Sequence, residues 1–180
     1  MRRYLILLVM LVSCNKPSGT QKETDLMDLI NDLPMMVPPI TFNSDRPISS
    51  DHQVEQQVLD KLQKLIPGYG LLGKLFDTEN FVAIIGVVPN DTGSPMILIF
   101  DRNGMQLDSY LLYETAGGDM GYESKNTVTI KPNKEIEFID STWTMKINKE
   151  RTNVIEGTDS LSVSRKLYLI SAVGQIQNIQ

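Results

Sequence analysis

The sequence has very little of the chemistry on which most enzymes and metal sites depend. Its 180 residues include one cysteine and one histidine. A chain with a single cysteine cannot form an internal disulfide, so its folding has to depend on burial of a hydrophobic core. Catalytic triads need an oriented imidazole beside a nucleophile, and zinc sites usually need several histidine or cysteine ligands. The sequence therefore predicts no catalytic residue, no metal site and no cofactor, and His52 is expected on the solvated side of a helix.

Basic residues are also in the minority. The chain has 17 lysines and arginines against 22 acids, which gives a formal net charge of −5. A surface of this sign repels phosphate backbones, and no basic stripe interleaved with aromatic residues is present. We therefore expect no nucleic-acid partner. With 41% hydrophobic residues, the chain falls within the range of a single ordinary globular domain.

A hydrophobic run long enough to cross a membrane is missing as well. The candidate near the N-terminus, Tyr4 to Val12, is much shorter than the roughly 20 residues that a helix needs to span a bilayer. It follows the positive pair Arg2 and Arg3 and is followed at once by polar residues. A charged segment before a short apolar segment is typical of a signal peptide, predicted here over residues 1–13.

The end of this segment, Leu11-Val12-Ser13-Cys14, resembles the bacterial lipobox. The resemblance implies that Cys14 is diacylated on sulfur and becomes the N-terminus after cleavage. Because each buried methylene adds about 0.8 kcal/mol, two or more chains hold a protein stably on a membrane. We expect residues 14–23 to be a lipidated flexible tether and 24–180 to form a single domain. The alternatives are a conventional secretory leader, although no A-x-A site lies near Cys14, or a short transmembrane helix.

The residues after Cys14 bear on where the lipoprotein is sorted. Asn15 takes the second position of the mature chain instead of aspartate, which by analogy with the enterobacterial sorting rule favours the outer membrane. The acidic run that drives surface display in Bacteroidetes lipoproteins is missing, since no acid occurs before Glu23. We therefore expect an envelope protein that is anchored in the outer membrane and faces the periplasm.

Helical patterns are confined to the first part of the domain. A short helix is predicted at residues 26–30, followed by an extended path through Pro34, Pro38 and Pro39. Ser50 and Gln53 have the spacing of a capping box, and apolar residues recur at helical intervals behind them. This pattern predicts a helix from about Asp51 to Ile66, ended by Pro67-Gly68.

The pattern from Tyr69 onward is that of strands. Runs with a two-residue period or with continuous apolar character, separated by turn residues, predict strands at residues 71–76, 81–88, 96–100, 105–114, 127–131, 135–147, 161–170 and 175–179. Trp143, Met145 and Ile147 alternate with polar residues, which is typical of a sheet with one wet side. The predicted fold class is α+β, with N-terminal helices packed on a bent antiparallel β-meander of six to eight strands.

Several of these features together resemble a family. The Pro-rich segment from Leu33-Pro34 to Phe42-Asn43, then Gly73-Lys74-Leu75, the turn Phe100-Asp101-Arg102-Asn103-Gly104, Leu111 and a Gly-Tyr loop are similar to those of the small, uncharacterised lipoproteins of Bacteroidetes. The resemblance covers most of residues 24–180, and Val173-Gly174-Gln175 departs from it. It implies the cell envelope and an antiparallel sheet behind a lipid tether, but no catalytic residue.

One loop gathers the polar residues that could bind a ligand. Between Glu114 and Ser124 it contains three glycines together with Glu114, Asp119, Tyr122 and Glu123. These residues are the candidate binding loop. Carboxylates in such a loop could bind calcium or flank a glycosidic bond, although they do not match an EF-hand. The bland alternative, a mobile connector whose glycines relieve turn geometry, is favoured at this point.

These observations predict a membrane-anchored, non-enzymatic envelope lipoprotein that binds a ligand or partner through a sheet face or its loops. The expected partners are the membrane, through the lipid on Cys14, and an envelope protein or glycan. Two alternatives stay open. A glycan hydrolase would need two carboxyl groups to converge, and a structural subunit of an outer-membrane complex would show an apolar patch on one sheet face.

Overall fold

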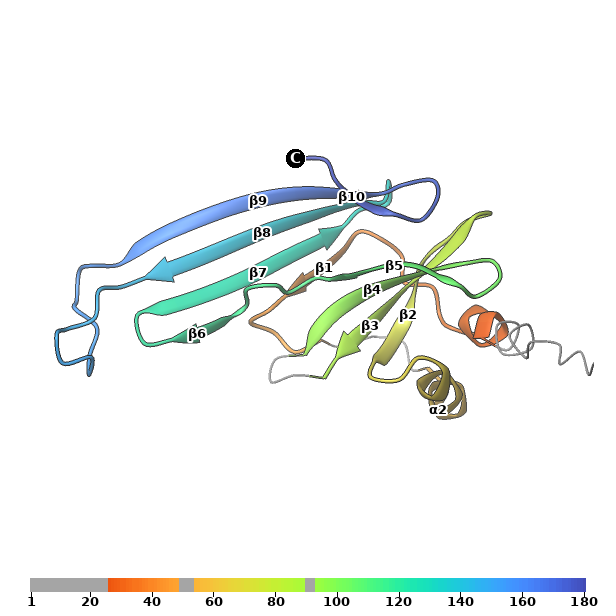
Figure 1. Ribbon diagram of the computed structural model, residues 1–180, viewed down its shortest axis with the longest axis horizontal. Coiled ribbons are helices and arrows are strands. Elements are labelled where there is room, and N and C mark those ends of the chain that lie inside the picture. The colour runs from red at the N-terminus through yellow and green to blue at the C-terminus, as the bar shows by residue number, and fades with distance from the viewer. Residues whose placement is uncertain (1–25, 49–53, 90–92) are drawn as a thin grey trace, which may run out of the picture.

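The computed structural model describes residues 26–48, 54–89 and 93–180, and these residues form two antiparallel sheets with helices on one side (Figure 1). The helical elements are a segment at residues 26–31 and α2 (Gln56–Leu65). The strands are β1 (Ile40–Asn43), β2 (Gly70–Asp77), β3 (Phe81–Val88), β4 (Ser94–Asp101), β5 (Gln106–Leu111), β6 (Gly117–Asp119), β7 (Tyr122–Ile130), β8 (Glu135–Thr144), β9 (Ser160–Ile170) and β10 (Ile176–Asn178).

Each sheet is built mainly from strands that follow one another in the sequence. The four-stranded sheet has the order β2-β3-β4-β5, and the six-stranded sheet has the order β1-β7-β8-β9-β10, with β6 paired to β7. Within each sheet the predicted antiparallel meander is confirmed. The expectation of one bent sheet is wrong, because the chain leaves the first sheet after β5 and starts a second one, to whose edge β1 is added.

The division into two sheets follows from where the apolar residues are. The strands β3 and β4 are buried on both faces, so their sheet has to be covered on both sides. Between the sheets lies a core that includes Phe81, Ile99, Val128, Ile136 and Phe138. The opposite face of the four-stranded sheet packs on the helical elements in a second core. The result is three layers, with the helices on the four-stranded sheet alone (Figure 1).

The helix α2 is shorter than the sequence predicts. It begins at Gln56, with Glu55 at the N-cap making no side-chain cap hydrogen bond, and its last turn is closed by the Ile66 N–H bonding the Leu62 carbonyl at 2.7 Å. Residues 50–53, which carry the predicted capping box and His52, lie outside the described residues. Leu62 is fully buried, so the predicted apolar face of this helix does pack on the sheet.

The Pro-rich segment has a specific place at the edge of the four-stranded sheet. The Met36 N–H donates to the Lys74 carbonyl at 2.7 Å, and the Lys74 N–H donates to the Pro34 carbonyl at 2.8 Å. These bonds cover the open edge of β2. The close approach needs a residue without a side chain, because a Cβ built on Gly73 would lie 2.6 Å from the Pro34 carbonyl oxygen.

Replacing Gly73 with alanine is expected to destabilise the protein by about 2 kcal/mol, because the new methyl group has to push the backbone of the Pro-rich segment away from β2. Gly70→Ala on the same strand is the control. A Cβ built there would be no closer than 4.0 Å to any neighbouring atom, so it causes no clash. Urea denaturation of both variants measures the difference. Equal stabilities would contradict this account of the edge.

The six-stranded sheet is longer than the sheet on which it packs. The halves of β7, β8 and β9 that lie away from β10 extend past the end of the four-stranded sheet (Figure 1). The burial pattern agrees, since residues 160–165 of β9 are all exposed whereas Ile170 is buried. We call this part the projecting end, comprising residues 117–126 and 139–165. It contains most of the predicted binding loop.

Candidate functional site

The predicted binding loop is largely ordered as a hairpin instead of the mobile connector that the sequence favoured. The strand β6 pairs with the first residues of β7, so that Gly118 lies opposite Glu123 and Asp119 opposite Tyr122. The turn between them depends on Gly121, which has a φ of +75° and whose Cβ position would lie 2.7 Å from the Met145 carbonyl oxygen. This position therefore requires a glycine, both because its φ is positive and because a side chain would clash with the Met145 backbone.

The strand alternation assigns each residue of the projecting end to one face. Val128 and Phe138 are opposite each other and lie in the core between the sheets, so that face is the inner one. Because side chains alternate along a strand, the next residues on the inner face are the pair Asn126 and Asp140, followed by the pair Ser124 and Thr142. The outer face carries Glu123 opposite Trp143. The apolar positions of this part of β8 are therefore on the outside of the molecule.

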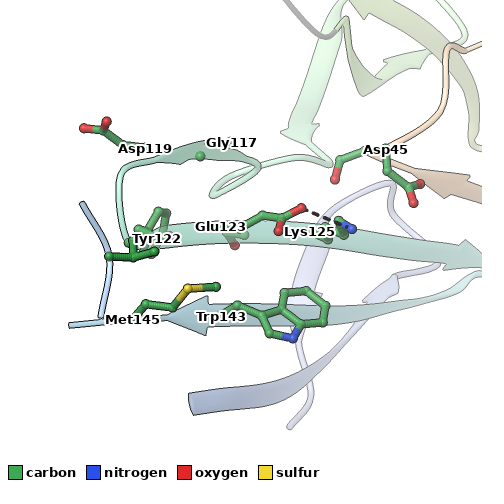
Figure 2. A pocket seen from close by; sticks show the side chains of 13 residues that line it. Asp45, Gly117, Asp119, Tyr122, Glu123, Lys125, Trp143 and Met145 are labelled. Carbon is green, nitrogen blue, oxygen red and sulfur yellow. Dashed lines mark ion pairs between the residues drawn. The ribbon is translucent and has the colours of Figure 1, made fainter. Parts of the chain in front are cut away.

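A wide hollow of about 670 Å³ opens at the projecting end. Its lining combines exposed apolar side chains with charged ones (Figure 2). Tyr122 and Met145 keep exposed fractions of 42% and 41%. The lining residues are Ser44, Asp45, Gly117, Gly118, Asp119, Gly121, Tyr122, Glu123, Ser124, Lys125, Trp143, Met145 and Val154. We call it the outer hollow because Glu123, Lys125 and Trp143 lie on the outer face of the sheet; Tyr122 and Ser124, which also line it, belong to the inner face by strand alternation.

Trp143 is the only tryptophan of the chain, and its surroundings are charged. The ammonium group of Lys125 lies 5.3 Å from the centre of its ring, within the range of a cation–π interaction. The same ammonium group is 3.1 Å from the Glu123 carboxylate. The ion pair holds Lys125 beside the ring, but both partners are largely exposed, so water screens the pair and it contributes little to stability.

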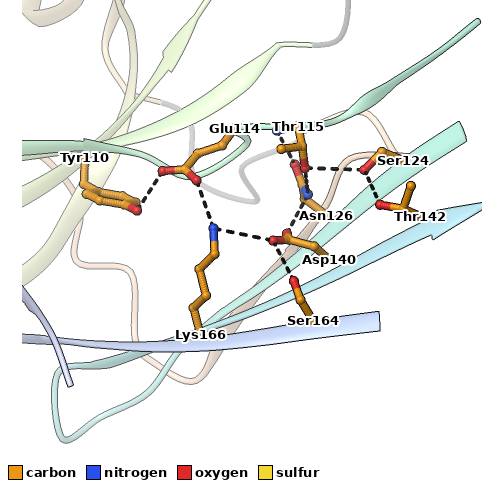
Figure 3. A network of polar contacts seen from close by, with 9 residues as sticks. All are labelled: Tyr110, Glu114, Thr115, Ser124, Asn126, Asp140, Thr142, Ser164 and Lys166. Carbon is orange, nitrogen blue, oxygen red and sulfur yellow. Dashed lines mark hydrogen bonds and ion pairs between the residues drawn. The ribbon is translucent and has the colours of Figure 1, made fainter. Parts of the chain in front are cut away.

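The inner face behind the outer hollow is closed by a polar network (Figure 3). Asn126, which is 1% exposed, donates from its side-chain amide to Asp140 at 2.7 Å and to the Thr115 hydroxyl at 2.9 Å. Its amide oxygen accepts from the Thr115 N–H at 3.3 Å. This network ties the crossover after β5 to β7 and β8. It holds the strands that form the floor of the hollow.

Glu114 belongs to this inner network and not to the outer hollow. Its carboxylate accepts hydrogen bonds from the Tyr110 hydroxyl at 2.8 Å and from the Lys166 ammonium group at 3.3 Å. The bond to Glu114 raises the pKa of Lys166, and burial followed by hydrogen bonding raises the pKa of Tyr110 far above its usual range. Lys166 therefore stays charged and Tyr110 neutral at physiological pH.

Of the four predicted loop residues, the structure brings Asp119, Tyr122 and Glu123 to the hollow and places Glu114 elsewhere. Glu114 and Glu123 lie on opposite sides of the sheet, and the carboxylate of Asp119 points away from Glu123 (Figure 2). Two carboxyl groups that flank a glycosidic bond have to face each other across about 5–10 Å. The acids of this loop do not form such a pair.

Sequence reasoning missed Asp45, Lys125 and Trp143 as members of the site. Asp45 follows β1, which is distant in sequence and joins the hollow only because β1 pairs with β7. The sequence does indicate Trp143 indirectly, because Trp143 alternates with Thr142 and Thr144 and so belongs to one face of β8. A sheet with one wet side would bury this apolar face, whereas the core lies on the other face.

A second, smaller cavity of about 190 Å³ lies beside β1 and includes Met36, Phe42, Ile48 and Tyr113 in its lining. The Tyr113 hydroxyl is buried and has no hydrogen-bond partner among the described residues. Burial, followed by the nearby negative charge of Asp45, raises the pKa of Tyr113 to about 12. An unfolded tyrosine ionises near pH 10. The folded state thus disfavours the phenolate.

This raised pKa predicts a pH dependence of stability. The contribution of neutral Tyr113 is fully present below about pH 10 and is lost as the pH rises toward the folded-state value near 12. Tyr113→Phe should match or exceed the wild-type stability at neutral pH, because no described bond is lost, and should lose less stability at alkaline pH. Urea denaturation of both proteins across this range tests it. Parallel curves would contradict the assignment.

Two features are absent from the part of the chain that the structure describes. In residues 26–48, 54–89 and 93–180, no group of three or more histidine, cysteine, aspartate or glutamate side chains is placed to hold a metal ion. In the same part of the chain, every helix is too short or too polar to cross a membrane.

Comparison of the chain with family models, with curated proteins and with solved structures finds no match. The similarity to Bacteroidetes lipoproteins therefore stays a prediction from sequence motifs.

Proposed function

We propose that this protein is a membrane-tethered, non-enzymatic envelope lipoprotein that binds a ligand or partner in the outer hollow. The observation that carries the proposal is the presence of Trp143, Tyr122 and Met145 around a large open hollow on a sheet that projects beyond its packing partner. Aromatic and methionine side chains are enriched where proteins bind partners, because they bury much area at small entropic cost. The tether on Cys14 remains part of the proposal.

The charges around the hollow restrict what fits it. Asp45, Asp119 and Glu123 supply acceptors, whereas Lys125 is the single cation in the lining. Ionised carboxylates accept hydrogen bonds and cannot donate them. The lining therefore favours a ligand with an apolar face edged by hydroxyl or cationic donors. A sugar ring of an envelope glycan and a basic peptide both have this form, and they are the two ligand classes that we would test.

Trp143 allows a direct test, because the fluorescence of the only tryptophan reports on the hollow alone. Titration with peptidoglycan fragments and with short basic peptides should change the emission of Trp143 in a saturable way for one of these probes. Lack of any saturable change with both probes would contradict the proposed site.

The Glu123→Lys variant should weaken binding of the active probe by about tenfold, because it replaces an acceptor with a cation in the lining. Glu135→Lys is the matched control: Glu135 lies at the other end of the outer face, where its carboxylate pairs with Lys131 at 3.2 Å. Titration of both variants with the same probe measures the effect. Equal affinities of the two variants would contradict a role of Glu123 in binding the probe.

A further inference from the structure

The strand β9 has a free edge along its first half. The short strand β10 pairs only with Tyr168, Leu169 and Ile170, at the end far from the projecting end (Figure 1). Residues 160–165 are exposed, and no other described strand pairs with them on that side. Protected edges usually carry prolines, bulges or lysines. The segment 160–164 has none of these, and its pairing with β8 shows no register shift.

The backbone groups of this edge can be assigned. The Ile170 N–H donates to the Lys134 carbonyl at 3.1 Å, so the even-numbered residues of β9 point their backbone groups toward β8. The Leu167 carbonyl accepts from the Ile179 N–H at 2.8 Å on the opposite side, as the alternation requires. Leu161, Val163 and Arg165 therefore direct their N–H and C=O groups toward the free edge.

We propose that a second copy of this chain pairs with this edge, antiparallel, about a two-fold axis at Ser162. In that register Leu161 lies opposite Val163 of the partner subunit, and Asp159 lies opposite Arg165 of the partner subunit. Each is a hydrogen-bonded pair of the antiparallel ladder, because odd-numbered residues face the edge in both copies. The two copies then form one continuous sheet.

Apolar contacts and charge both favour a second copy of this chain as the occupant. Leu161 and Val163 are 54% and 59% exposed, and Leu161 lies directly opposite Trp143 in its own chain. Pairing would join these residues into one apolar stripe across the axis on the outer face. Asp159 and Arg165 meet as opposite charges. Arg165 already pairs with Glu137, and its guanidinium group has donors left for a second carboxylate.

Neighbouring registers lack this combination. Centring the pair on Val163 places Leu161 opposite Arg165 of the partner subunit and leaves Asp159 opposite Leu167 of the partner subunit. Centring it on Leu161 places Val163 opposite Asp159 of the partner subunit. Only the register about Ser162 matches apolar with apolar and acid with base, so the proposal specifies which residues meet.

A single cysteine at the axis tests this register. In the full chain carrying Cys14→Ser, the Ser162→Cys thiol would face its own copy in a non-hydrogen-bonded pair, with Cα atoms about 4.5 Å apart, within disulfide range. Ser164→Cys is the matched control. In this register residue 164 lies opposite residue 160 of the second copy, so the two introduced thiols are four residues apart along the strand, about 13 Å. Mild oxidation should convert most of the first variant to a covalent dimer and little of the second.

The charge pair gives a second test that does not depend on a disulfide. Asp159→Arg and Arg165→Asp each place like charges together twice in the dimer, and each should weaken self-association by about tenfold or more in sedimentation velocity. Mixing the two variants pairs opposite charges at both places and should restore association. This restoration would not occur if the substitutions merely damaged the fold.

Three results would overturn the proposal: equal crosslinking of the two cysteine variants, a wild-type chain that sediments as a monomer at high concentration, or a mixture that stays dissociated. In the monomer case the edge would be left for a strand of another protein. None of these experiments uses a ligand, so their failure is distinct from failure of the proposed binding function.

Discussion

Replacing Asn126 with alanine is expected to lower the free energy of unfolding by about 3 kcal/mol. Asn126 is 1% exposed, and its side chain bonds Asp140, the Thr115 hydroxyl and the Thr115 N–H at once. Alanine leaves all three partners without this bond, and an unsatisfied buried group costs about 1–3 kcal/mol, more when it is charged. The loss should be large because three hydrogen bonds are lost together at one buried side chain.

Asn153→Ala is the control for this prediction, since Asn153 lies exposed in the connection between β8 and β9. Its loss of stability should stay within about 0.5 kcal/mol, as for most surface substitutions. Urea denaturation followed by circular dichroism measures both. An Asn126→Ala variant as stable as the control would mean that the inner network does not hold the crossover after β5 to β7 and β8.

Replacing Cys14 with serine is expected to move nearly all of the protein from the membrane fraction to the soluble fraction of a bacterial host. A thiol is needed for the lipid attachment, and the hydrophobic contribution of the acyl chains is lost with it. Labelling with radioactive palmitate should mark the wild-type chain and not the variant. Membrane attachment without any palmitate label would contradict the lipoprotein assignment.

Much of the strand pattern could be predicted, because it depends on local sequence. The turn residues Asp101-Arg102-Asn103-Gly104 do close the β4–β5 hairpin, with Asp101 accepting bonds from the Asn103 and Met105 N–H groups at 2.9 and 2.8 Å. The continuous apolar run of residues 81–88 predicts a strand, and this strand is β3. In both cases the local sequence determines the structure without help from distant residues.

The division into two sheets could not be predicted, because it depends on pairing between distant segments. The strands β1 and β7 pair over a sequence separation of about 85 residues, and no local motif marks this pairing. For the same reason the sequence alone does not show which face of β8 packs on the core. Over the predicted strand 135–147 the Trp143 side has more apolar residues, because Met145 and Ile147 are included, but the other side packs on the core through Ile136 and Phe138.

The candidate site could be predicted only in part. Asp119, Tyr122 and Glu123 were recognisable because glycines and polar residues gather in one loop. Glu114 was grouped with them by sequence proximity, but strand β7 carries Glu123 to the opposite side of the sheet from Glu114 and its Lys166 partner. Asp45 could not be predicted as a lining residue, because it reaches the hollow only through the pairing of β1 with β7.

The central claim is that this protein binds an envelope component at the outer hollow, and photocrosslinking in intact bacteria tests it most directly. A photoreactive residue at Met145, in the lining, should give crosslinked products other than a dimer of the chain itself. These products should disappear when Trp143→Ala is added. The same probe at Val173, which is 61% exposed and lies outside the hollow, should not give them. Identical products from both positions, or products that survive Trp143→Ala, would contradict the account.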